Sequence, residues 1–242
     1  MAWTINNGQL YFNTKLYTGT GSTLNITGVG FQPDLVWVKG RSEVASHRLN
    51  DIVRGAGTEL LTNTSSAEYT YSPNTALKSF DSDGFTLGTD NGINKNSVTY
   101  ASWNWKAGTS FTNDASATGI GSIDSTGSVN TTSGFSIVSW TGTGSNGTIK
   151  HGLSTAPKWV ICKRRDADDS WWTYINSIGA GGQMVLQSAS AEGSDGGVLW
   201  NSTNPTSSVF SVGTNGGVNA SSGTYIAYCF AEKQGYSKFG SY

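Results

Sequence analysis

The sequence has little charge, and it lacks long apolar runs. Aspartate, glutamate, lysine and arginine make up 13% of the 242 residues, about half of the usual ~25%, and the net charge is −1. This balance argues against a broad basic face of the kind that binds nucleic acid. No apolar run approaches the roughly 18 residues of a membrane span, and residues 1–8 lack the basic and apolar segments of a signal peptide. We therefore expect no nucleic acid partner and no membrane insertion.

Proline is also scarce, with only 4 residues, whereas glycine is abundant, with 32. The low charge does not predict disorder here, because aromatic residues reach 12% and disordered chains have few of them. Glycine favours tight turns, because it adopts backbone angles that other residues avoid. The composition therefore predicts a folded chain in which many glycine turns join short strands.

One stretch of the sequence occurs twice. Residues 88–100 (GTDNGINKNSVTY) match residues 213–225 (GTNGGVNASSGTY), and the shift is 213 − 88 = 125. Both copies combine turn residues with the start of an aromatic strand. Two further blocks match in the same order at shifts of 123 and 124: residues 12–22 with 135–145, and residues 31–41 with 155–165. Matches in the same order at nearly one shift predict an internal duplication.

Strand patterns are dense in both copies, and helix patterns are weak. Segments such as residues 34–39 and 158–163 are rich in β-branched and aromatic residues and are bounded by glycine or asparagine. The nearest approach to a helical period is at residues 46–54, which we interpret as a strand, like the corresponding residues 171–178. We predict an all-β fold of two tandem antiparallel β-sandwich repeats, jelly-roll or lectin-like in type.

The predicted domains are a first β-sandwich repeat at residues 1–108, a connector rich in Ser, Thr and Gly at residues 109–131, and a second repeat at residues 132–242. The connector holds four larger apolar residues, more than a free linker needs. We therefore expect it to lie on the surface of one repeat, with a strand near residues 122–129.

Cysteine and histidine are too few to indicate a catalytic or metal site. Cys162 and Cys229 correspond to Val38 and Asn104 in the first copy, so the repeated fold does not need a disulfide. Buried free thiols are the favoured interpretation, and a bridge between neighbouring strands is the alternative. His47 and His151 are the two histidines, and they are not equivalent in the duplication. Neither a hydrolytic triad nor a zinc site follows from them.

Two motif-like stretches have simpler explanations. Residues 142–147 read G-x-G-x-x-G, but a strand and a turn follow them, whereas phosphate binding requires a helix. Asp81 and Asp83 resemble part of a calcium loop without its later glutamate ligand, and turn formation explains them better. We expect no catalytic residues, no metal and no cofactor.

The aromatic residues divide into a predicted core and a candidate binding group. Five aromatic residues lie in strand-like runs, which predicts that they are buried: Trp37, Trp103, Trp105, Trp159 and Phe230. Trp171 and Trp172 are adjacent, so on a strand they face opposite sides and one of them can be exposed. An exposed indole near Arg165 and Asp168 suits sugar stacking or a protein contact, whereas packing in the core and at the sheet edge is the plainer alternative.

The sequence also resembles a known family. Residues 28–39 (GVGFQPDLVWVK) and 46–49 (SHRL) are similar to a duplicated β-sandwich domain of tailed-phage virion and tail-fibre proteins, especially from phages of marine and cyanobacterial hosts. The second copy carries the similar segments 151–153 (HGL), 156–158 (APK) and 225–232 (YIAYCFAE). The resemblance covers nearly the whole chain and assigns no active-site residues.

The resemblance implies a non-enzymatic structural or adhesive component of the virion, assembled in the host cytoplasm. Its expected partners are other virion proteins and, on a tail fibre, a glycan or protein of the host surface. The alternatives are a capsid decoration protein of the head and a polysaccharide depolymerase. A depolymerase usually shows a long β-helix or a groove lined by carboxylates, and the sequence indicates neither.

The last residues suggest self-association. Residues 237–242 resemble the entry to a further repeat, and an open strand edge invites pairing with another chain. Because Met1 lies close to the first copy, we expect a stand-alone component. By analogy with phage appendages, we expect a homo-oligomer of the trimeric kind, with the C-terminal residues at a subunit or particle contact.

Overall fold

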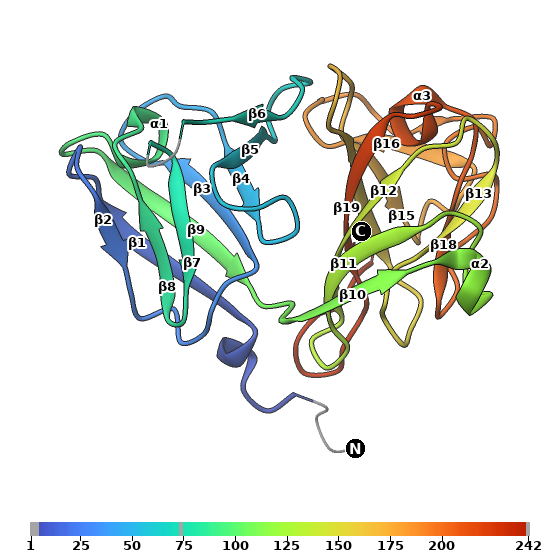
Figure 1. Cartoon of the computed structure of the whole chain (residues 1–242), viewed down its shortest axis with the longest axis horizontal. Helices are drawn as coiled ribbons and strands as arrows, with labels where there is room; N and C mark the ends of the chain where they lie inside the picture. Colours follow the sequence, from blue (N-terminus) through green and yellow to red (C-terminus); the bar gives the residue numbers. More distant parts are fainter. Residues whose placement is uncertain (1–4, 73–74, 241–242) are drawn as a thin grey trace. The chain divides into compact units, whose positions relative to one another are not determined.

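The computed structural model describes residues 5–72 and 75–240, and in these residues it is nearly all antiparallel β-structure (Figure 1). The described helices are one 3-10 turn, η1 (Gly8–Leu10), and three single turns of α-helix. The α-helical turns are α1 (Asn91–Asn94), α2 (Ala115–Thr118) and α3 (Gly216–Asn219). The all-β prediction is confirmed. None of the described helices is long and apolar enough to cross a membrane.

The chain divides into two compact units. Asn7–Gly108 forms the N-terminal unit, and residues 109–240 with residues 5 and 6 form the C-terminal unit. Residues 109–131 are not a separate connector, because they contribute two strands to the C-terminal unit, and one of them lies where a strand near residues 122–129 was predicted. Residues 1–4 of the first predicted repeat, and residues 241 and 242 of the C-terminal tail, lie outside the described residues.

The N-terminal unit is built from two facing sheets. A six-stranded sheet has the order β1-β9-β3-β4-β5-β6, and a three-stranded sheet has the order β2-β8-β7. Their bounds are β1 (Phe12–Thr18), β2 (Leu24–Ile26), β3 (Leu35–Gly40), β4 (Arg48–Asp51), β5 (Thr58–Leu61), β6 (Tyr69–Thr70), β7 (Leu77–Asp81), β8 (Gly84–Leu87) and β9 (Thr99–Trp105). Buried side chains of β3, such as Val36 and Val38, pack with Phe85 and Leu87 of β8 to form the core of this unit.

The C-terminal unit has an eight-stranded sheet of order β10-β11-β12-β19-β14-β15-β16-β17 and a two-stranded sheet of β13 and β18. The bounds are β10 (Thr109–Asn113), β11 (Ser125–Asn130), β12 (Phe135–Thr141), β13 (Gly147–Lys150), β14 (Trp159–Arg164), β15 (Trp172–Ile175), β16 (Gly182–Val185), β17 (Gly193–Ser194), β18 (Val209–Val212) and β19 (Thr224–Phe230). Its core includes Val138, Trp140, Val160 and Phe210.

The strand order β12-β19-β14-β15-β16-β17 repeats the order β1-β9-β3-β4-β5-β6, and the pair β13–β18 repeats the pair β2–β8. Such a correspondence is what an internal duplication predicts. Strands β10 and β11 extend the larger sheet of the C-terminal unit only, so the two units differ at that edge. The segments at residues 46–54 and 171–178 contain the strands β4 and β15, as expected.

The repeated stretch makes the same hydrogen bonds in both units, through one buried asparagine in each. Asn219 is fully buried, and its Nδ2 atom donates to the carbonyl oxygens of Ser145 and Gly213, at 2.6 and 2.9 Å. Its Oδ1 atom accepts a hydrogen bond of 2.9 Å from the backbone N–H of Thr143. Asn94 makes the corresponding three bonds in the N-terminal unit. One buried amide therefore fastens the helical turn to two loops, because each loop offers backbone groups that would otherwise lack partners.

The aromatic and cysteine predictions have mixed outcomes. Cys162 and Cys229 are free and buried, as the favoured interpretation expected. The aromatics predicted to be core residues are only partly buried and lie outside the core clusters of their units: Trp37, Trp103, Trp105, Trp159 and Phe230. That prediction was wrong, because strand alternation sends their neighbours into the core and turns these five side chains to the other face.

Candidate functional site

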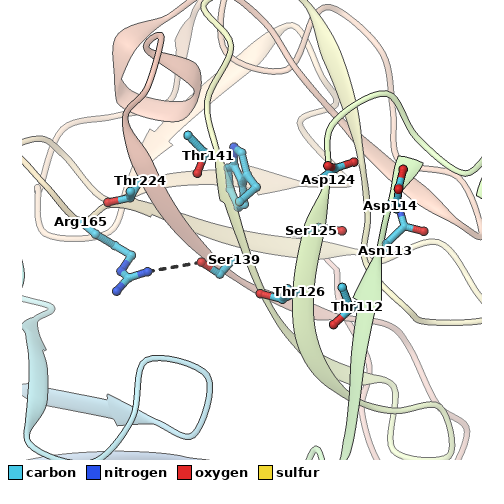
Figure 2. A pocket seen from close by; sticks show the side chains of 11 residues that line it. Thr112, Asn113, Asp114, Asp124, Ser125, Thr126, Ser139, Thr141, Arg165 and Thr224 are labelled. Atoms are coloured by element: carbon cyan, nitrogen blue, oxygen red, sulfur yellow. Dashed lines mark hydrogen bonds between the residues drawn. The ribbon is translucent and has the colours of Figure 1, made fainter. Parts of the chain in front are cut away.

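A polar hollow of about 320 Å³ lies on the C-terminal unit, where β10, β11 and β12 run side by side (Figure 2). Six hydroxyl-bearing side chains contribute to its lining, together with two carboxylates, an amide, a guanidinium and an indole. The lining residues are Thr112, Asn113, Asp114, Asp124, Ser125, Thr126, Ser139, Trp140, Thr141, Arg165 and Thr224.

Strand register brings several hydroxyls into one row. Thr112 of β10 lies opposite Thr126 of β11, and Thr126 lies opposite Ser139 of β12. Directly opposite residues in a sheet project from the same face. The three side chains therefore form a cross-strand row on one surface of the sheet, with hydroxyl groups that can both donate and accept hydrogen bonds.

Arg165 stands at one end of this row, just after β14. Its guanidinium donates a hydrogen bond of 3.4 Å to Oγ of Ser139 (Figure 2), and its backbone N–H donates to the carbonyl oxygen of Thr224 at 2.8 Å. The turn that follows is fixed by the ion pair of Arg164 with Asp166, at 3.0 Å. The hydrogen bond from Arg164 holds the pKa of the Asp166 carboxyl below its ordinary value. Arg165 is thus anchored through its backbone and positioned at the hollow.

Asp114 and Asp124 supply negative charge at the other end (Figure 2). Asp114 caps α2, since its Oδ1 atom accepts a bond of 3.0 Å from the backbone N–H of Ala117. Asp124 Oδ1 accepts from the backbone N–H of Ala115 at 2.8 Å. Hydrogen bonds from Ser116 and Ala117 lower the pKa of Asp114 from its ordinary value, so this carboxyl is ionised at neutral pH.

Asn113 fixes the loop beside these carboxylates. Its side chain donates to the carbonyl oxygen of Ile120 at 2.9 Å and accepts from the Thr118 hydroxyl at 2.8 Å. The hollow is therefore held in shape by bonds within its own loops. A shaped surface that carries hydroxyls between carboxylates and a guanidinium complements a ligand rich in hydroxyl groups, because each ligand hydroxyl finds both donors and acceptors.

Only one of the predicted binding residues reaches this hollow. Arg165 lines it, whereas Asp168 is exposed in the loop after β14 and is not part of the lining. Trp171 is fully buried and offers no surface for a ligand to stack on. Trp172 is half-buried, and its indole N–H donates to Asp169 at 3.1 Å. The two adjacent indoles do differ in exposure, but neither lies with Arg165 at the hollow.

Most of the lining comes from residues 112–126, where the sequence predicted a connector. The signal that could have found them is modest: an aspartate before a short Ala/Ser segment, which is typical of a helix cap. Among the described residues, no three histidine, cysteine, aspartate or glutamate side chains gather closely enough to hold a metal ion.

Comparison with known proteins identifies a family without an assigned activity. No curated protein matches the chain, and no solved structure matches it. A family model described as a domain of unknown function, DUF7483, matches residues 7–242. Because this match spans both units, the chain belongs to the DUF7483 family.

Proposed function

We propose that this protein is a non-enzymatic component of a phage virion, placed on a tail fibre, and that it binds a host-surface glycan in the polar hollow of its C-terminal unit. The observation that carries the proposal is the row of Thr112, Thr126 and Ser139 hydroxyls between the Asp114 and Asp124 carboxylates and the Arg165 guanidinium. The sequence resemblance to tailed-phage virion proteins supports the same role. Binding without reaction fits the Asp114 carboxyl, since its pKa is lowered rather than raised toward that of a general acid.

Substitutions in the hollow are expected to weaken glycan binding while the fold is kept. Arg165→Ala should lower the affinity for host-envelope polysaccharide fragments about tenfold or more, because hydrogen bonds to charged groups contribute roughly 1.5–3 kcal/mol. Thr126→Val should lower it several-fold, since valine keeps the shape and strand preference of threonine but removes its hydroxyl. Isothermal titration calorimetry measures both effects.

Lys158→Ala is the matched control for Arg165→Ala. Lys158 bonds to Asn176 at 3.2 Å, away from the hollow, and its removal also deletes one positive charge. The control should bind within about twofold of wild type. Equal binding by the Arg165→Ala and wild-type proteins would refute glycan binding at this hollow. Release of reducing sugar from host envelope by the wild-type protein would refute the non-enzymatic role.

The proposal includes self-association into a homo-oligomer, with a trimer as the expected form, and contacts with other virion proteins. Strand β1 ends the order of the six-stranded sheet in the described part of the chain, and Leu16 on it is 65% exposed. An edge strand with an exposed apolar side chain favours pairing with another chain, and the low charge of the protein does little to oppose it. The turn at residues 233–237 closes with a bond from the backbone N–H of Lys233 to the carbonyl oxygen of Ser237 at 3.1 Å.

Two variants test the oligomer. Leu16→Lys should weaken assembly, because a lysine on an edge strand discourages pairing. Deletion of residues 238–242 should also weaken assembly, and it leaves the turn at residues 233–237 in place. Sedimentation velocity should show wild-type trimers and dissociated variants with unchanged circular dichroism. A wild-type protein that sediments as a monomer, unaffected by either change, would contradict the oligomer.

A further inference from the structure

The N-terminal unit carries an aromatic cup that the proposed function does not use. It encloses about 280 Å³ and is lined by Trp37, Lys39, His47, Trp103 and Trp105, which all belong to this unit. Its volume lies just below the usual range for small-molecule sites, roughly 300–1,000 Å³. The cup therefore suits one ring-sized group.

Register and alternation place the indoles on the face of the six-stranded sheet that points away from the core. Trp37 lies between the buried residues Val36 and Val38, and it is directly opposite Trp103 on β9. Successive side chains of a strand point to opposite faces, so both indoles project from the outer face. There they are partly exposed and do not join the core cluster.

The indole rings are inclined to one another and form a concave surface. The centroids of Trp37 and Trp103 are 6.4 Å apart with an interplanar angle of 65°, and those of Trp37 and Trp105 are 6.5 Å apart at 35°. Phe12 packs on Trp105 at 4.8 Å and supports it from the neighbouring strand β1. Inclined rings around an open volume provide several flat apolar faces for one small group.

The shared strand order shows that the fold does not require these indoles. The C-terminal unit has Ile161 in the place of Trp37, and Tyr228 lies opposite Ile161 as Trp103 lies opposite Trp37. The same architecture is thus built with a smaller side chain at the first of these positions and a phenol at the second. Large, partly exposed indoles at positions where the fold accepts other residues are typical of a binding surface.

Lys39 gives the cup its charge. It is two residues from Trp37 on β3, so its side chain lies on the same face. The Nζ atom donates one hydrogen bond to the carbonyl oxygen of Ala45 at 2.9 Å, and an ammonium group has two further donors. Burial and the nearby Lys39 charge lower the pKa of His47, so the imidazole is neutral at neutral pH. The ammonium of Lys39 is then the cation of the lining.

This combination selects among ligand classes. A positive charge beside the indoles disfavours quaternary ammonium groups, which aromatic cages otherwise bind. A single-stranded nucleic acid needs a basic groove along its backbone, whereas this lining holds one lysine on a chain of net charge −1. A sugar ring has an apolar face of C–H groups that stacks on an indole, and a carboxylate on that sugar would complement Lys39.

We propose that the cup is a second ligand site, which binds one hexuronate residue of an acidic polysaccharide, with the sugar ring against Trp37 and Trp103 and its carboxylate at Lys39. This site stands independently of glycan binding at the polar hollow. It requires only the geometry of the N-terminal unit.

The test uses the full chain labelled with 5-fluorotryptophan, because its nine tryptophans give separate fluorine resonances that single Trp→Phe variants assign. The probe is an oligosaccharide of glucuronic acid, compared with a glucose oligosaccharide of the same linkage and length. The expected result is a saturable shift of the Trp37 and Trp103 resonances with the acidic probe, at an affinity at least about fivefold higher than with the neutral probe.

Three variants complete the test. Trp103→Leu should lower the affinity for the acidic probe about tenfold. Leucine keeps an apolar side chain on the strand, so the variant is expected to fold. Lys39→Gln should remove the preference for the acidic probe and the salt dependence of binding. Arg165→Ala, in the polar hollow, should leave both the shift of the Trp37 and Trp103 resonances and the preference for the acidic probe unchanged. This result separates the proposal from the proposed function.

Three outcomes would overturn the proposal. The first is that neither resonance shifts with the acidic probe. The second is that both probes bind equally and Lys39→Gln has no effect. The third is that a thymidine oligonucleotide binds the cup more tightly than the acidic oligosaccharide and displaces it.

Discussion

Replacing Asn219 by alanine is expected to cost the C-terminal unit about 3–5 kcal/mol of unfolding free energy. The side chain is fully buried and makes three hydrogen bonds to the backbone of two loops, at 2.6, 2.9 and 2.9 Å. Alanine leaves two carbonyl oxygens and one N–H group without their partner. Urea unfolding, with hydrogen exchange of peptides from β12, β14 and β19 as a readout specific to this unit, measures the loss.

Two further variants separate hydrogen bonding from packing. Asn219→Asp has nearly the same shape but replaces the Nδ2 donor with an acceptor that faces two carbonyl oxygens, so it should be at least as destabilising as alanine. Asn176→Ala removes an exposed asparagine whose bond to Lys158 is 3.2 Å long, and it should cost less than about 0.5 kcal/mol. A cost for Asn219→Ala no larger than that of this control would contradict the assigned role. Asn94→Ala should have the corresponding effect in the N-terminal unit.

Acidification is expected to destabilise the C-terminal unit through His151. This side chain is fully buried, its Nδ1 atom accepts a bond from the backbone N–H of Leu153 at 3.1 Å, and its Nε2 atom lies 3.2 Å from the carbonyl oxygen of Thr206. Nε2 therefore carries the proton. Burial lowers the pKa of His151 from 6.5 to about 4, because a charged imidazole would lose its hydration, and the Thr206 bond only partly offsets this cost.

The direction of the pH effect follows from this lowered pKa. Between pH 6.5 and about 4 the unfolded chain binds a proton at this histidine that the folded unit does not bind, so stability falls as the pH falls through this window. The full loss is about 3 kcal/mol. Unfolding free energies of the C-terminal unit, measured at half-unit intervals from pH 7 to pH 4, should show the decline.

His151→Asn provides the control, because its side-chain oxygen can accept the Leu153 bond and does not titrate. The variant should start less stable and should lose much less of its stability over the same window. Asp34 and Glu59, in the N-terminal unit, act in the opposite direction, since burial raises the pKa values of their carboxyls to about 6 and about 7. They favour the folded N-terminal unit at lower pH, so the readout must come from peptides of the C-terminal unit. Parallel pH profiles of stability for the variant and the wild type would contradict this role of His151.

The sequence was most informative where backbone chemistry is restrictive. The repeated stretch combines glycine, asparagine and a tyrosine near the start of a strand. In each unit one buried asparagine, Asn94 or Asn219, bonds a helical turn to the neighbouring loops. The hydroxyl of Tyr225 bonds to the backbone of Gly216 and Ala220 of the same stretch, as the hydroxyl of Tyr100 does with Asn91 and Lys95. Residues that satisfy specific backbone groups repeat together, so the pattern is visible without a structure.

The candidate site was less predictable, because its residues have weak individual preferences. Strands β10 and β11 consist largely of Ser, Thr, Gly and Asn. Their strand conformation depends on the pairing of β10 with β11 and of β11 with β12 rather than on local propensity. Burial of neighbouring aromatics is also set by tertiary packing. Alternation predicts that Trp171 and Trp172 differ in exposure, as they do. It cannot show that Trp171 is fully buried or that the Trp172 indole donates a hydrogen bond to Asp169.

The most direct test of glycan binding at the polar hollow is a crystal structure of the protein soaked with an oligosaccharide cut from the surface polysaccharide of its host. The account predicts an intact oligosaccharide in the hollow of β10, β11 and β12, within hydrogen-bond distance of Asp124, Thr126 and Arg165. An empty hollow at saturating ligand, or a cleaved oligosaccharide within it, would contradict the account.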